Sequence, residues 1–212
     1  KPLAAQFPNA FHDSDLGPIP EGWKQVGLGE VAHCFDSKRV PLSKRQREKR
    51  QGPYPYYGAA SIMDYVDDYL FDGIYVLMGE DGSVITDAGN PVIQYAWGKF
   101  WVNNHAHVLQ GKLGVSTEHL MLSLKETNLS PYVTGAVQPK LNQGNMNQIP
   151  FVLGGDECLS AFASYIAPPY EKYRANVKAG LTLSALRDTL LPKLLSGELR
   201  VKDAEKFVEA EV

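Results

Sequence analysis

The residues with the clearest chemical potential form a basic segment between positions 38 and 50. Lys or Arg occupies seven of these thirteen positions, and Glu48 is the only acid among them. A cluster of this density attracts a phosphate backbone, because each neutralised phosphate releases counterions. The alternative is a solvated loop without a partner. The residues expected to contact phosphate are Lys44, Arg45, Arg47, Lys49 and Arg50.

Aromatic residues follow the basic segment directly. Tyr54, Tyr56 and Tyr57 precede Gly58, and rings beside a glycine allow base edges or sugars to approach closely. We predict that Tyr54 and Tyr57 face a groove of the duplex. The alternative is an aromatic cluster in the hydrophobic core, and this is the interpretation we favour for Tyr56.

A second polar segment is rich in side-chain amides and extends from Gln138 to Pro150. Asn and Gln can form paired hydrogen bonds with adenine in the major groove, and each pair contributes about 1–3 kcal/mol of discrimination. Our candidates for this surface are Lys140, Asn142 and Gln143. The alternative is a set of turns whose amides satisfy their own backbone. The segment is predicted to be a loop with at most one helical turn.

Two histidines suggest metal-dependent hydrolysis as an alternative chemistry. His105 and His107 are two apart on a predicted strand, so they would face the same way. No third ligand follows at a familiar spacing, which favours a pair of satisfied histidines. Neighbouring acids such as Glu80-Asp81 usually point apart and make poor acid–base pairs. The sequence therefore predicts a protein that reads its partner without catalytic residues, a metal or a cofactor.

The elements that must position these residues are short strands and one helix. Strands are predicted over 74–78, 92–97 and 105–110, which are rich in β-branched and aromatic residues. Ser116 or Thr117 can cap a helix that runs to about Lys125. The pattern predicts an α+β domain with an irregular, mostly antiparallel sheet, followed by a long C-terminal helix.

The C-terminal third carries apolar residues at helical spacing. Asp156 can cap a first helix, Pro168-Pro169 is predicted to break or kink it, and Ser196-Gly197 is predicted to end the long helix that follows. Such a ridge is expected to pack along another helix, although a helix folded back on its own core is the alternative. The predicted pairing residues are Tyr173, Val177, Leu183, Leu186, Leu190 and Leu194.

Length and charge place the chain among ordinary globular proteins. Its 212 residues are 44% hydrophobic and 21% charged, so disorder of the bulk is not expected. The net charge is −3, whereas the basic segment alone carries +7 − 1 = +6, so the remainder sums to −9 and the charge is strongly uneven. Two cysteines are too few for a disulfide framework and favour a reducing cytoplasm, and no apolar run is long enough for a membrane span.

The sequence resembles the carboxy-terminal half of a type I restriction–modification specificity subunit. The amide-rich segment and the end of the C-terminal ridge are the more specific signals, and the shorter segments support them. The resemblance lies in 11–23, 56–58, 69–73, 79–82, 104–109, 138–143 with 149–150, and 186–201. It implies a domain organisation of a linker at 1–20, a target recognition domain at 21–154, a long-helix region at 155–200 and a flexible tail at 201–212.

The resemblance also implies a function and partners. A full subunit of this family has two such halves, and each recognition domain reads one half of a split site in double-stranded DNA. The two long helices pair antiparallel, set the spacing and dock methyltransferase (modification) subunits, and restriction subunits join that complex. Lys1 in place of Met suggests a piece of a longer chain, and a half-size subunit that pairs with a second copy is the alternative. A helical assembly module whose globular part binds protein remains a further alternative.

Overall fold

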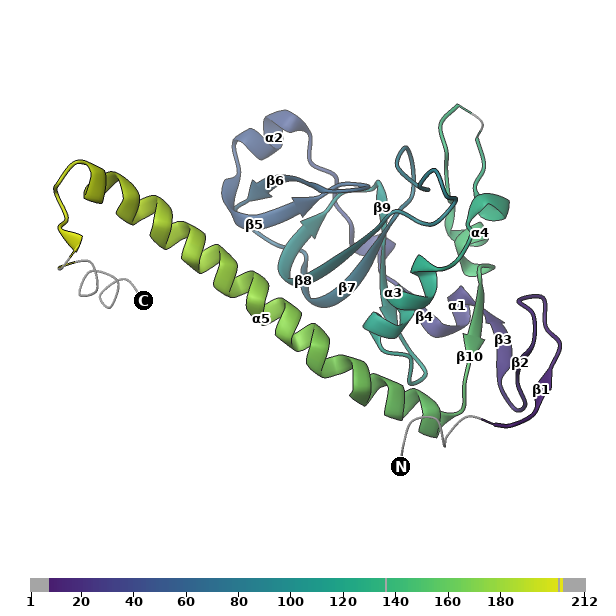
Figure 1. Ribbon diagram of the computed structural model, residues 1–212. Coiled ribbons are helices and arrows are strands. Elements are labelled where there is room, and N and C mark those ends of the chain that lie inside the picture. The colour runs from purple at the N-terminus through teal and green to yellow at the C-terminus, as the bar shows by residue number, and fades with distance from the viewer. Residues whose placement is uncertain (1–7, 136, 202, 204–212) are drawn as a thin grey trace. The chain divides into compact units, whose positions relative to one another are not determined.

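The computed structural model describes residues 8–135, 137–201 and 203, and a six-stranded sheet forms the centre of its first unit (Figure 1). The sheet is antiparallel except where β5 and β8 run parallel. The predicted mostly antiparallel sheet is therefore confirmed. Its strand order is β4 (Ala32–Cys34), β9 (Ala106–Gly111), β7 (Phe71–Gly79), β8 (Ile93–Val102), β5 (Gln51–Tyr57) and β6 (Ile62–Val66).

An aromatic core covers one face of this sheet. The rings of Phe71 and Phe100 stack with centroids 5.4 Å apart, and Tyr75 meets Phe100 edge-on at 5.5 Å. Such offset and edge-on pairs contribute beyond simple burial. The helix α3 (Thr117–Lys125) packs against β7, β8 and β9. The central strand β7 is therefore buried along most of its length, which explains its nearly continuous run of apolar residues.

Smaller elements close the first unit around this sheet. The strand β10 pairs with β3 along its whole length, and this pairing brings position 24 next to position 153. A Cβ atom at Gly27 would lie only 2.6 Å from the carbonyl oxygen of Asn147, so glycine permits this close approach. The remaining elements are β1 (Phe11–His12), β2 (Ile19–Pro20), β3 (Lys24–Gly27), α1 (Leu28–Val31), α2 (Lys44–Glu48), α4 (Gln143–Asn147), β10 (Pro150–Leu153) and 3₁₀ turns at Asp36–Lys38 and Ser130–Tyr132.

The predicted elements are present, with shifted ends. The Oγ of Ser116 accepts a hydrogen bond from the amide of His119 at 3.1 Å, so the predicted cap of α3 is confirmed. The segment after Gln138 contains one short helix, as predicted. The strand β8 continues past Gly98 to Val102, because Gly98 pairs with Gly73 of β7 and does not end the ladder. The predicted linker at 1–20 contains the small β1–β2 hairpin in its described part, residues 8–20.

The chain divides into two units after Ile166, and the second unit comprises residues 167–212. The helix α5 (Asp156–Leu195) begins in the first unit and ends in the second. The predicted break at Pro168-Pro169 is wrong, because α5 is one helix of 40 residues. A proline inside a helix leaves the carbonyl four residues earlier without a donor. Here those carbonyls belong to Ser164 and Tyr165, both exposed, so water can satisfy them. Each proline is expected to destabilise the helix by about 3 kcal/mol, and the helix nevertheless continues.

The apolar residues of α5 occupy two faces of the helix. At about 100° per residue, the four leucines of the predicted pairing set share one arc, and Tyr173 and Val177 lie about a third of a turn away. Large apolar side chains remain exposed along this part of the helix, with Leu181 and Leu183 at 68% and 65%. The predicted ridge is thus present, but it is not a single stripe.

The helix ends where the sequence indicates. Gly197 has φ = +77°, and the amide of Leu199 donates to the carbonyl of Lys193 at 3.0 Å. This is the left-handed ending that glycine permits. Neither α5 nor any shorter helix among the described residues has the length and apolarity that a bilayer crossing requires. The predicted flexible tail at 201–212 lies outside the described residues, apart from 201 and 203.

Candidate nucleic-acid interface

The basic segment forms the short helix α2 instead of an open loop. Ser43 caps this helix: its Oγ accepts from the Gln46 amide at 3.3 Å, while Oε1 of Gln46 accepts from the Ser43 amide at 2.8 Å. Such a reciprocal capping box satisfies two backbone donors at a helix start. The helix α2 packs beside β6. Its cations are therefore presented from a defined surface.

Two of the predicted phosphate contacts hold this surface together. Arg47 donates from Nε to Asp64 at 3.1 Å and from Nη1 to the Leu42 carbonyl at 2.7 Å. Its guanidinium also lies 5.1 Å from the centre of the Tyr56 ring. Arg50 pairs with Asp67 at 2.8 Å. These two arginines are bound within the protein, and a contact with DNA stays a prediction for them.

The other three cations of this set are available to a partner. Lys44, Arg45 and Lys49 are exposed, and within the described residues none of their side chains has a hydrogen bond or an ion pair. Two nearby acids are already neutralised, since Asp64 pairs with Arg47 and Asp67 pairs with Arg50. The exposed surface of α2 is therefore positive.

Arg47→Ala and Arg45→Ala form a matched pair, because Arg47 is bound within the protein whereas Arg45 is exposed to solvent. We expect Arg47→Ala to lower the free energy of unfolding by about 1.5–3 kcal/mol, the scale of charged hydrogen bonds removed from partly buried partners. Arg45→Ala should change it by no more than about 0.5 kcal/mol, as exposed substitutions do. Urea titration of both variants measures the difference. Equal stabilities would show that the Arg47 contacts do not stabilise the fold.

The tyrosines after α2 divide between core and surface. Tyr56 is 1% exposed, so the predicted core position is confirmed. Tyr57 is half-buried and packs edge-on against Phe100, with centroids 5.5 Å apart. Tyr54 lies against Tyr69, with centroids 5.1 Å apart. Of the two predicted groove-facing rings, Tyr54 is the one that does not pack on the central core.

A cation extends the Tyr54 surface. The Nζ atom of Lys99 lies 4.6 Å from the centre of the Tyr69 ring, and its hydrogen bond with Tyr69 raises the pKa of Lys99. Lys99 is exposed, so this charge is presented to solvent at neutral pH. Aromatic faces beside a cation are suited to sugars and bases of a nucleic acid.

The amide-rich segment folds into a turn and the helix α4, and some of its amides serve the backbone. The side chain of Asn142 caps α4 by accepting from the Asn145 amide at 2.9 Å, and Asn145 Nδ2 donates to the Tyr132 carbonyl at 2.8 Å. The turn interpretation is thus confirmed for Asn142, whereas Asn145 binds a carbonyl outside the segment. Lys140 and Gln143 are exposed and belong to the same segment, which we call the closing segment (138–149).

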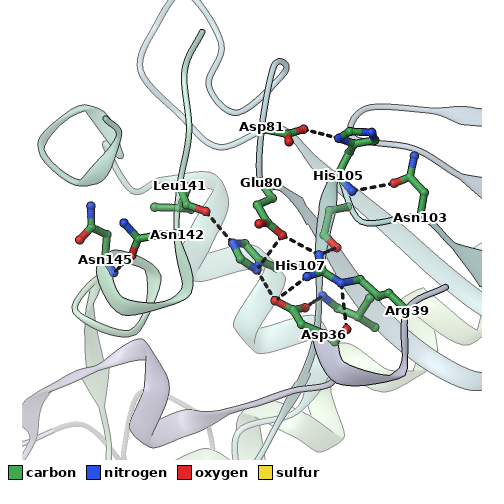
Figure 2. Close-up of polar contacts among 12 residues, drawn as sticks. Asp36, Arg39, Glu80, Asp81, Asn103, His105, His107, Leu141, Asn142 and Asn145 are labelled. Carbon is green, nitrogen blue, oxygen red and sulfur yellow. Dashed lines mark hydrogen bonds and ion pairs between the residues drawn. The ribbon is translucent and has the colours of Figure 1, made fainter. Parts of the chain in front are cut away.

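A largely buried ionic cluster lies beside Leu141 of the closing segment (Figure 2). The guanidinium of Arg39 donates to Glu80 at 2.7 Å and to the Ala106 carbonyl at 2.7 Å, and lies 3.3 Å from Asp36. His107, only 1% exposed, bonds to Asp36 through Nδ1 at 2.6 Å. The cluster joins three parts of the chain that are distant in sequence.

Both ring nitrogens of His107 have an oxygen partner. Its Nε2 lies 2.8 Å from the carbonyl oxygen of Leu141, and its Nδ1 faces the carboxylate of Asp36. A carbonyl oxygen can only accept a hydrogen bond, so Nε2 is the donor in the contact with Leu141.

The hydrogen bonds keep Asp36 ionised. Burial works against its charge, but bonds from His107 and the Val108 amide, with the positive charges of His107 and Arg39, hold the pKa of this carboxyl below its ordinary value. Burial raises the pKa of the neighbouring Cys34 thiol to about 12.

Cys34, Asp36 and His107 are close enough to share a metal ion. However, the carboxylate of Asp36 already bonds to His107 and to the Val108 amide, and it lies 3.3 Å from Arg39. The cluster is better described as a paired ionic network than as a metal centre.

The two histidines of the hydrolase alternative do not face the same way. His105 precedes β9 and is exposed, with Nδ1 bonded to Asp81 at 2.5 Å, whereas His107 points into the cluster (Figure 2). The prediction of a shared direction is wrong because the strand begins only at Ala106, so strand alternation does not apply to His105. The proposed basis for joint metal binding is lost.

A chain of contacts links α2 to the closing segment. Asp64 of β6 binds Arg47 of α2, and the preceding residue, Met63, receives a contact from Asn103 Nδ2 at 3.5 Å. Asn103 in turn accepts from the amide of His105 at 2.8 Å. The last two links are the His105–Asp81 pair and a backbone bridge between Asp81 and Lys140. We call the loops joined by these contacts the loop rim.

The loop rim includes residues that the sequence did not single out as contacts. Asn104 and His105 are exposed on it, whereas residues 106–109 are buried. Met63 is 53% exposed beside Asn103. Asn104 and His105 could have been found from the sequence, because they are hydrophilic residues directly before the buried strand β9. No local signal pointed to Met63.

A sequence model described as "Type I restriction modification DNA specificity domain" matches residues 20–153. The chain belongs to this family. The match ends three residues before α5 begins, so it covers the sheet, the basic helix α2 and the closing segment.

Named relatives agree with this assignment. The chain is 41% identical over 128 residues to a type I restriction enzyme specificity subunit of Haemophilus influenzae, covering 60% of this chain and 32% of the relative. A specificity subunit of Methanocaldococcus jannaschii is 24% identical over 214 residues, covering 91% of this chain and 48% of the relative. The chain therefore spans about half, or less, of the length of these relatives.

A solved structure shows that the fold is shared. The crystal structure of a type I restriction–modification system S subunit from M. genitalium superimposes with a TM-score of 0.59 at 15% identity. The superposition covers 82% of this chain and 46% of that chain. The expected recognition fold, an α+β body followed by a long helix, is thereby confirmed.

Proposed function

We propose that this chain is a non-catalytic DNA-specificity half that reads one part of a bipartite duplex site. Membership of the specificity-domain family carries this proposal. The loop rim supports it, because it links the exposed cations of α2 to the exposed Lys140 and Gln143 of the closing segment. Methyltransferase subunits, and restriction subunits through them, are the partners we propose, by analogy with the family.

The loop rim suggests a division of work between its two ends. Lys44, Arg45 and Lys49 of α2 would contact phosphates and set the orientation of the domain, without reading sequence. Lys140 and Gln143 of the closing segment would approach base edges in a groove. In this proposal the cations of α2 position the duplex, and the closing segment discriminates between base sequences. The two ends of the loop rim can therefore be tested by separate measurements.

The buried ionic groups support a binding role. His107, Asp36 and Glu80 are satisfied by Arg39 and by one another, and His105 is bonded to Asp81. A general acid or base must reach the proton that it transfers. Groups committed to internal partners serve better to hold loops in place.

The long helix is proposed to pair with a second long helix. That helix would belong to the other half of the subunit or to a second copy of this chain. Apolar side chains exposed on α5, among them Leu183 and Leu195, support the proposal, since a solvated helix gains nothing from them. Pairing would set the spacing between two recognition domains and so the gap in the DNA site.

Salt dependence of duplex binding tests the proposed function. Binding is expected to weaken steeply as salt rises, because phosphate contacts release counterions. Replacing Lys44, Arg45 and Lys49 together with Ala should weaken binding at physiological salt by about tenfold or more, and reduce the slope of log K against log salt by about 3. Fluorescence anisotropy with a labelled random-sequence duplex measures both quantities.

A control variant with the same change of charge separates local from global effects. Lys172, Lys178 and Arg187 are exposed cations of α5, far in sequence from the loop rim. Replacing these three with Ala should leave the slope unchanged. If the α2 variant binds as the wild type does, the phosphate assignment fails. If neither wild type nor control binds any duplex at low salt, the proposed function fails.

A further inference from the structure

His107 connects the buried ionic cluster to the backbone of the closing segment. Its Nε2 donates to the Leu141 carbonyl at 2.8 Å, and this carbonyl lies between Lys140 and Asn142 in the chain. The amide of Leu141 donates to the carbonyl of Glu80 at 2.8 Å, and its side chain is fully buried. Leu141 is therefore held by hydrogen bonds at both its amide and its carbonyl. It adjoins Lys140 in the chain, one of the residues proposed to contact DNA.

The rest of the cluster fixes the direction of the imidazole ring. Asp36, from the 3₁₀ turn after β4, holds Nδ1 at 2.6 Å, and Glu80, at the end of β7, lies 3.8 Å from the same nitrogen. Arg39 pairs with both acids. The thiol of Cys34 is the other titratable group close to the ring, and its raised pKa keeps it neutral. With Nδ1 fixed on a carboxylate, Nε2 can point only along the line to Leu141.

We propose that His107 is a positioning residue for base reading: its Nε2 contact with the Leu141 carbonyl sets the closing segment in register with the DNA groove. This inference rests on the proposed function. His107 itself is buried and touches no base. Losing the Nε2 contact should relax the sequence that the domain selects, while phosphate binding by α2 remains.

Two isosteric substitutions separate the two ring nitrogens. In His107→Asn the amide nitrogen takes the place of Nδ1, so the Asp36 bond is kept and the Leu141 bond is lost. In His107→Gln the amide nitrogen takes the place of Nε2, so the Leu141 bond is kept. Both variants replace the imidazole with a neutral amide, which makes them matched controls for each other.

Selection from a pool of duplexes randomised at their centre is the first measurement on the full chain. We expect wild type and His107→Gln to select the same sequence. His107→Asn should discriminate that sequence from a scrambled duplex about tenfold less well, the scale of one lost base contact. Its salt slope should equal that of wild type. Equal discrimination by both variants and wild type overturns the inference, and so does equal loss in both variants.

Hydrogen exchange of the closing segment without DNA is the second measurement. The amides of Asn145 and Met146 should exchange faster in His107→Asn than in His107→Gln or wild type, since the segment is released. Equal exchange in all three proteins overturns the inference. This measurement is independent of duplex binding, so a failure of the proposed function is recognised separately.

A spectroscopic measurement on wild type covers the case in which His107→Asn does not fold. Nitrogen NMR of the imidazole should show a proton on Nε2, as the Leu141 carbonyl requires. A scalar coupling from the Nε2 proton to the Leu141 carbonyl should accompany it. An Nε2 without a proton, or without this coupling, would overturn the inference.

Discussion

Replacing Arg39 with Met is expected to lower the free energy of unfolding by about 3–5 kcal/mol, the usual cost of leaving buried charges without their partner. Its guanidinium serves Asp36, Glu80 and the Ala106 carbonyl at once, and its side chain is only 12% exposed. The free energy of unfolding of a typical domain is about 5–15 kcal/mol, so this loss is a large part of the stability. Urea denaturation at neutral pH measures it.

Two controls define what this loss means. Arg45→Met removes a cation from the same basic segment at an exposed position, and it should change stability by no more than about 0.5 kcal/mol. Adding Glu80→Gln to Arg39→Met should restore part of the loss, since one of the two unpaired acids is then neutral. A loss below about 1 kcal/mol for Arg39→Met would show that the cluster tolerates uncompensated acids.

Acid unfolding should change in the same variant. The pKa of Asp36 is lowered in the folded protein, so its contribution to stability is present above its ordinary value near 4 and is lost as pH falls through the folded value. Arg39 is one cause of the lowered pKa. Without it the folded pKa rises, and the acid-induced loss should begin at a higher pH than in wild type.

Local patterns in the sequence predicted the elements well. The β-branched and aromatic runs marked β7, β8 and β9, and Ser116 marked the start of α3, because strand propensity and capping are properties of a few neighbouring residues. The end of α5 at Ser196-Gly197 also followed from local chemistry. The predicted break at Pro168-Pro169 is wrong because a helix end depends on whether the freed carbonyls find other partners. That depends on exposure, which the sequence does not show.

The basic segment shows why the candidate site was only partly predictable. Counting charges gave one cationic surface, but Arg39, Arg47 and Arg50 pair with acids that are 41, 17 and 17 positions away. Such pairs form only when the sheet brings distant strands together. The exposed remainder, Lys38, Lys44, Arg45 and Lys49, could be recognised only from the fold.

The same reasoning applies to His107. Its partner Asp36 is 71 positions away, and its other partner is a backbone carbonyl 34 positions away, which no side-chain pattern reveals. The sequence grouped His107 with His105 because they are close along the chain. In the structure the two rings bind different acids and have different exposure.

The two faces of α5 make a specific demand on any partner helix. Leu183, Leu186, Leu190 and Leu194 follow one another at spacings of three or four residues, as in a pairing seam. Tyr173 and Val177, earlier in the helix, lie about a third of a turn away. A straight partner cannot cover both faces equally. We therefore expect the leucine face to contribute most of the pairing energy.

Replacing both Leu186 and Leu190 with Glu is expected to weaken helix pairing by at least about 100-fold. Burial of a leucine contributes about 1.5–3 kcal/mol, so two lost leucines remove about 3–6 kcal/mol before the cost of burying charge. Sedimentation velocity of the chain over a range of concentrations measures the association. Ala185→Glu with Thr189→Glu adds the same charges about a third of a turn away, and this control should associate as wild type does. A double-leucine variant that remains as dimeric as wild type would place the pairing face elsewhere, with Tyr173 and Val177 as the next candidates.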